Sequence, residues 1–93
     1  MRIRWTVPAA DDLEGIKRYL EAHLPQVAEK TARRIYGQAL SLKHWPERGR
    51  PGHRRGTREL VLAPLPYIVV YRINGDAVEI LHICHGAQAW TEN

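Results

Sequence analysis

The chain has 93 residues, of which 44% are hydrophobic and 26% charged, and it contains a single cysteine, Cys84. This length corresponds to one domain, residues 1–93, and leaves no room for a separate cofactor-binding domain. The composition excludes an intrinsically disordered chain, and no stretch reaches the roughly 20 apolar residues of a membrane span. One cysteine cannot form an internal disulfide, so a reducing, cytoplasmic location is expected.

The positive charge of the chain is concentrated in residues 43–58. This segment has six basic residues and one acid, a net charge of +5, whereas the rest of the chain has eight basic and nine acidic residues. Such a segment points to an anionic partner, either nucleic acid or an acidic protein, although a solvated basic loop has the same composition. The basic residues are Lys43, Arg48, Arg50, Arg54, Arg55 and Arg58.

The first half of the chain predicts a strand and two helices. Residues 2–7 alternate polar and apolar side chains, as a half-buried strand does. Pro8 ends this strand, and a helix is expected over residues 9–23, followed by a second over residues 25–44. The second helix has an apolar seam with helical spacing, formed by Ala28, Ala32, Ile35, Ala39 and Leu42.

The second half predicts a loop and three strands. The loop covers residues 47–57, and strands are expected over residues 58–63, 67–73 and 77–84. The sequence Asn74-Gly75-Asp76 favours a hairpin turn, and short connections join antiparallel neighbours. The expected fold class is therefore α+β: a strand, a helical hairpin and a three-stranded meander, with an antiparallel sheet covered on one face by the helices.

Arginine and histidine side chains lie near the predicted strand ends. We expect Arg58 and residues 82–85 to lie toward one edge of the sheet, beneath the basic loop, with Arg72 toward the other. Metal-independent RNA cleavage requires a group that transfers protons and cations that stabilise the phosphorane charge. His85, and with less support His82, could transfer the proton, whereas a structural histidine at a strand end would look the same.

Other chemistries have little support in the sequence. His82, Cys84 and His85 are metal-ligand types, but strand alternation turns neighbours to opposite faces, so neither a metal nor another cofactor is expected. Cys84 stands in an apolar strand and is expected to be a small buried hydrophobic residue. Trp90 lies in a short polar tail, where it could stack on a base or fold back onto the sheet.

Three groups of residues together resemble the RelE/ParE toxins. They are the opening Trp5-Thr6-Val7-Pro8-Ala9-Ala10-Asp11-Asp12-Leu13 with Tyr19 later in the helix, the central Pro46, Gly49 and Arg50 before Gly56-Thr57-Arg58-Glu59-Leu60, and the closing runs Pro66-Tyr67-Ile68-Val69-Val70-Tyr71-Arg72-Ile73 and Val78-Glu79-Ile80-Leu81-His82-Ile83-Cys84-His85-Gly86. The resemblance covers essentially the whole chain.

The resemblance implies the toxin of a type II toxin–antitoxin pair, neutralised in a hetero-oligomer by a short acidic antitoxin. ParE-like members inhibit DNA gyrase and are not enzymes, whereas RelE-like members cleave mRNA on the ribosome. The tail of this chain has no Tyr or Arg after Gly86, which favours the gyrase alternative. A non-catalytic nucleic-acid-binding module is a further alternative. The candidate catalytic residues are His85 and Arg58, and the candidate target-binding residues are Arg48, Arg50, Arg54, Arg55, Arg58, Arg72 and Trp90.

Overall fold

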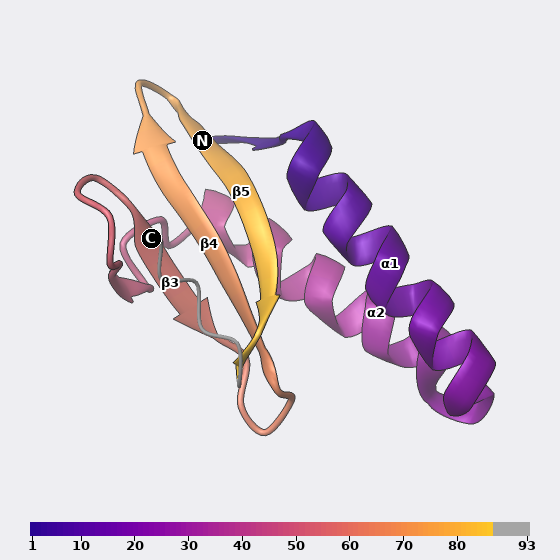
Figure 1. Ribbon diagram of the computed structural model, residues 1–93. Coiled ribbons are helices and arrows are strands. Elements are labelled where there is room, and N and C mark those ends of the chain that lie inside the picture. The colour runs from indigo at the N-terminus through magenta and orange to yellow at the C-terminus, as the bar shows by residue number, and fades with distance from the viewer. Residues whose placement is uncertain (87–93) are drawn as a thin grey trace.

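A five-stranded sheet carries both helices on one face (Figure 1). The computed structural model describes residues 1–86. The predicted α+β class, with its helical hairpin and meander, is confirmed. The elements are β1 (Arg2–Trp5), α1 (Val7–His23), α2 (Pro25–Leu40), the 3-10 turn η1 (Ser41–Lys43), β2 (Arg50–Pro51), β3 (Arg58–Val61), β4 (Tyr67–Asn74) and β5 (Ala77–His85).

Local sequence signals explain where the helices begin and end. The Thr6 hydroxyl caps α1 by accepting a hydrogen bond from the amide of Ala9 at 3.3 Å, and a proline stands in the first turn. The second helix is shorter than expected, because its regular part ends at Leu40 and continues as the 3-10 turn η1. Most of its apolar seam is buried in the protein's own core, with Ile35 and Ala39 fully inaccessible.

The strands follow the order β1-β5-β4-β3-β2. The meander β3-β4-β5 is antiparallel as expected, and the two-residue strand β2 adds a further edge to β3. The expectation of a wholly antiparallel sheet is wrong in one respect, since β1 pairs parallel with β5 and the sheet is mixed. Because two helices separate β1 from the meander, no tight turn determines its direction.

A β-bulge interrupts β5 at Leu81. Val70 pairs with His82 whereas Tyr71 pairs with Ile80, so Leu81 has no partner on β4. The Thr6 hydroxyl donates to the carbonyl of Ile80 at 2.7 Å and lies 3.3 Å from that of Leu81, which holds this irregular turn of the strand against α1.

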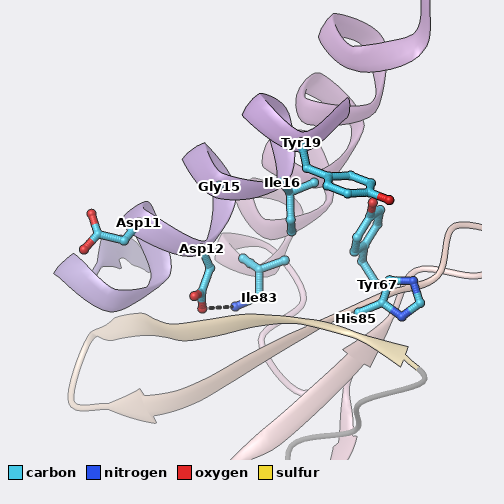
Figure 2. A pocket seen from close by; sticks show the side chains of 8 residues that line it. All are labelled: Asp11, Asp12, Gly15, Ile16, Tyr19, Tyr67, Ile83 and His85. Carbon is cyan, nitrogen blue, oxygen red and sulfur yellow. Dashed lines mark hydrogen bonds between the residues drawn. The ribbon is translucent and has the colours of Figure 1, made fainter. Parts of the chain in front are cut away.

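The bulge shifts the side-chain alternation along the rest of β5. Before it, Val78 and Ile80 pack in the core beneath the helices, and after it Ile83 takes that role. His85, two residues after Ile83, consequently faces the helical side of the sheet (Figure 2).

Candidate functional site

A cavity of about 500 Å³ opens between α1 and the ends of β4 and β5 (Figure 2). Helix α1 contributes one wall and the strand ends contribute the other. The bulge in β5 gives this cavity its histidine, because it turns His85 toward α1. The lining residues are Asp11, Asp12, Gly15, Ile16, Tyr19, Tyr67, Ile83 and His85.

Asp12 joins the helix to the strand at the inner wall of this cavity. Its Oδ2 accepts a hydrogen bond from the amide of Ile83 at 2.9 Å and lies 3.1 Å from Nδ1 of His82. Strand β1 ends at Trp5, opposite Ile80, so the Ile83 amide lies beyond the reach of a strand partner on that side. The Asp12 carboxylate supplies the acceptor that the missing strand would otherwise provide.

Two tyrosines and His85 form the other end of the cavity. The rings of Tyr67 and His85 meet edge to face at 5.7 Å, and Figure 2 shows the Tyr19 hydroxyl directed toward that of Tyr67. Burial, with a smaller effect of Tyr19, raises the pKa of Tyr67. Among the described residues lining this cavity there are two aspartates and no lysine or arginine, so a bound phosphate would meet negative charge.

The structure does not bring Arg58 and His85 together, and the expectation that they converge is wrong. Arg58 pairs with Tyr71, whereas His85 pairs with Tyr67, four positions away along β4. At about 3.3 Å per residue this places them about 13 Å apart along the strand direction. In a three-stranded meander the first and third strands run in the same direction, so the start of β3 lies with the start of β5. Arg72, expected at the other edge, consequently lies at the same end as Arg58.

Two buried glutamates on the sheet neutralise several of the candidate cations. Glu59 lies 2.9 Å from Nη2 of Arg50 and 3.1 Å from Nδ1 of His53. Burial opposes ionisation of Glu59, but the hydrogen bonds from His53 and Arg50 outweigh it and hold the pKa of this carboxyl below its usual value.

The second carboxylate lies between two arginines from neighbouring strands. Glu79 is 2.6 Å from Nε of Arg72 and 2.6 Å from Nη1 of Arg4. The hydrogen bond from Arg72 has the largest effect and lowers the pKa of Glu79 against a smaller effect of burial. Arg50 and Arg72, two candidate target-binding residues, therefore each have a carboxylate partner within the protein.

Arg48 and Arg58 bind neutral groups instead. Arg48 donates to the Ser41 hydroxyl at 2.6 Å and to the side-chain oxygen of Gln38 at 2.9 Å. Arg58 donates to the carbonyl of Glu47 at 3.3 Å, and its buried Nε has no hydrogen-bond partner among the described residues. Within the part of the chain that the structure describes, no carboxylate hydrogen bond therefore offsets the positive charge of these two side chains.

Three further candidate target-binding residues and the single cysteine remain to be placed. Arg54 and Arg55 are exposed in the turn that precedes β3, and Trp90 lies outside the described residues. Cys84 is partly buried, and burial together with Asp12 and Glu59 raises its pKa to about 11, so its thiolate is scarcely populated at neutral pH.

Sequence reasoning missed the aspartate and the two glutamates that organise these surroundings. Glu59 and Glu79 stand inside apolar strands, and a carboxylate at such a position indicates a cation on a neighbouring strand. For Asp12 the sequence offers no comparable signal, because its partner lies 71 positions away.

Membrane insertion by a helix has no support in the part of the chain that the structure describes. Neither α1 nor α2 combines the length and the apolar character needed to cross a bilayer.

The helical hairpin packed on one face of a small mixed sheet is the fold of the toxins in the ParDE and RelBE toxin–antitoxin structures. The family model for the ParE toxin of the type II toxin–antitoxin system parDE matches residues 3–90. The chain therefore belongs to the RelE/ParE family of type II toxins.

Curated relatives and solved structures agree with this assignment. The chain is 45% identical to Y4kP of Sinorhizobium fredii, a candidate toxin, over 98% of this chain and 94% of that protein. It is 37% identical to the toxin RelE2 of Caulobacter vibrioides, over 94% of this chain and 97% of the relative.

Two toxin–antitoxin structures share the fold. A chain of the chromosomal ParDE system from P. aeruginosa superposes with a TM-score of 0.85 at 31% identity, covering 91% of this chain and 95% of that one. A chain of the RelBE2 toxin–antitoxin complex from Mycobacterium tuberculosis superposes with a TM-score of 0.61 at 26% identity, covering 90% of this chain and 95% of that one.

Proposed function

We propose that this protein is a ParE-type toxin that inhibits DNA gyrase in the cytoplasm and is neutralised by a cognate acidic antitoxin. The choice of gyrase as the target rests on one observation, the separation of Arg58 from His85 along the strands of the sheet. RNA cleavage without a metal requires a proton-transferring group and a cation at one phosphate. His85 faces a cavity with two aspartates, and Arg58 lies at the opposite end of the sheet.

The similarity to ParE proteins supports the same choice. The matching family model is that of ParE and covers nearly the whole chain. The fold is closer to the ParDE chain, with a TM-score of 0.85, than to the RelBE2 chain, with 0.61. Because another relative is the toxin RelE2, RNA cleavage is the alternative function that an experiment has to exclude.

The charge of the chain supports an acidic antitoxin. The net charge is +4, and the turn that precedes β3 adds exposed arginines to Arg48 and Arg58, whose hydrogen bonds within residues 1–86 go to neutral groups. Acidic side chains on a partner protein would complement this surface, and the two proteins would form a hetero-oligomer.

The experiment is induced expression of the toxin in a bacterial host, with and without a short acidic reading frame from the adjacent gene. We expect growth arrest that the adjacent frame relieves. Plasmid isolated during arrest should lose negative supercoiling, and purified toxin should inhibit supercoiling by gyrase in vitro. Mapping of RNA 5′ ends in the same cultures should show no new cuts in translated messages.

The variant His85→Ala separates the two targets. A gyrase inhibitor that does not use His85 for proton transfer should still arrest growth and relax plasmids in this variant. Cuts in translated mRNA that His85→Ala abolishes, with unchanged supercoiling, would instead establish RNA cleavage. Arrest that leaves both supercoiling and RNA intact would contradict both targets.

A further inference from the structure

An exposed tryptophan, Trp45, lies in the turn that follows the helical hairpin, and Arg48 lines the same cavity. Trp45 is 64% exposed, and the imidazole of His44 approaches its indole edge-on at 5.8 Å. An open cavity of about 550 Å³ borders it, lined mainly by apolar atoms of residues 44–48. Together with Arg58, which donates to the carbonyl of Glu47, these residues form what we call the Trp45 surface.

The backbone that carries Trp45 is held rigidly. The Tyr71 hydroxyl donates to the carbonyl of Pro46 at 2.7 Å and accepts from the amide of Gly49 at 2.8 Å. The amide of Trp45 itself donates to the carbonyl of Ser41. Tyr71 is fully buried, so the turn is tied to the core while the indole remains in solvent. An indole on a fixed backbone requires less ordering when a planar group stacks on it than one on a mobile loop.

The charges around the indole favour an anion. The Arg48 guanidinium is oriented by the neutral side chains of Ser41 and Gln38, and Arg58 donates to the neutral carbonyl of Glu47. Lys43 adds a third cation on the exposed turn before Trp45. Glu47 is the one carboxylate among residues 43–48, and its repulsion of an anion is opposed by these cations.

We propose that the Trp45 surface binds single-stranded nucleic acid, with a base stacked on Trp45 and the neighbouring phosphates at Arg48 and Arg58. Each nucleotide supplies both a planar ring and an anion, which matches an indole flanked by guanidinium groups. The side chains of aspartate and glutamate supply an anion but no ring for the indole. Such binding is an activity beyond the inhibition of gyrase and does not depend on it.

The test measures fluorescence anisotropy of a labelled 12-nucleotide oligothymidylate with the full-length toxin. We expect Trp45→Ala to weaken binding about tenfold and Trp45→Phe to weaken it less than about threefold, because stacking requires a ring. Arg48→Gln should reduce the slope of log affinity against log salt by about 0.7, as the loss of one phosphate contact does for a single strand. Glu47→Gln should strengthen binding.

Two exposed residues on α2 provide matched controls. Arg34→Gln removes a cation and Tyr36→Ala removes a half-exposed aromatic ring, and both should bind the oligonucleotide like the wild type. A thermal melt of each variant shows whether the fold is retained. Equal binding by folded Trp45→Ala and wild-type protein would overturn the proposal. So would a poly-glutamate peptide that binds at Trp45 while the oligonucleotide does not.

Discussion

Arg58 and His85 lie on the same face of the sheet but at opposite ends, separated by the four positions of β4 between Tyr71 and Tyr67. Arg58 donates to the carbonyl of Glu47 at one end, and His85 packs edge to face against Tyr67 at the other. The two side chains that the sequence suggests as one catalytic pair are therefore independent parts of the structure.

This independence predicts additive effects on stability. In a double-mutant cycle by urea unfolding, Arg58→Ala and His85→Ala should change the free energy of unfolding additively to within about 0.5 kcal/mol. Arg50→Ala and Glu59→Ala provide the positive control, because their side chains lie 2.9 Å apart and should show a coupling energy. A coupling between Arg58 and His85 as large as that of the control pair would contradict the strand register.

Asp12 is predicted to stabilise the end of β5. Replacing it with alanine removes the acceptor of the Ile83 amide and should lower the free energy of unfolding by about 1–3 kcal/mol. The neighbouring Asp11 is exposed and provides the matched control, whose alanine variant should lie within about 0.5 kcal/mol of the wild type. Urea unfolding followed by circular dichroism measures both, and equal losses would show that the hydrogen bond to Ile83 adds nothing.

Gly49 is predicted to tolerate no side chain. A Cβ at this position would lie 2.8 Å from the Tyr71 ring and 2.9 Å from the carbonyl of Glu59, so Gly49→Ala should destabilise the fold by about 2 kcal/mol or more. Gly37, in α2, has no atom within 4 Å of such a Cβ, and Gly37→Ala should stabilise the helix by about 0.5–1 kcal/mol. Thermal melts of the two variants should shift in opposite directions, and a shift of the same sign in both would contradict this account.

Glu59 is predicted to stabilise the folded protein at neutral pH but not in acid. Its pKa is held below the usual value of 4.5 in the folded protein, so its contribution is complete above that pH and is lost as the pH falls through the folded pKa. The variant Glu59→Gln should be less stable than the wild type near neutral pH and should show a shallower decline in acid. Urea unfolding between about pH 6 and about pH 3 measures this, and parallel declines would assign the acid sensitivity to other carboxylates.

Local signals in the sequence were sufficient for the order of β1, the two helices and the three strands of the meander, but not for the two-residue strand β2. Gly75 has a positive φ of 62° in the hairpin turn between β4 and β5, which the run Asn74-Gly75-Asp76 predicts, and this turn alone makes the two strands antiparallel neighbours. Thr6 and Pro8 similarly predict the start of α1, because a helix cap and its first turn are contacts between near neighbours.

Only the tertiary structure determined where the candidate residues lie relative to one another. The bulge at Leu81 turns His85 toward α1, and it is held by Thr6, which lies 75 positions away along the chain. The parallel pairing of β1 and the capture of Arg50 by Glu59 likewise depend on packing between strands rather than on any one segment.

The basic segment of residues 43–58 shows the same contrast between what composition determines and what packing determines. Its length and its charge of +5 were fixed by composition, but the fold decided which charges remain available. Glu59 binds Arg50, whereas Arg48 and Arg58 have neutral partners beside an exposed Trp45. A charge counts toward a binding surface only where no buried carboxylate neutralises it, and long-range packing alone determines where the carboxylates lie.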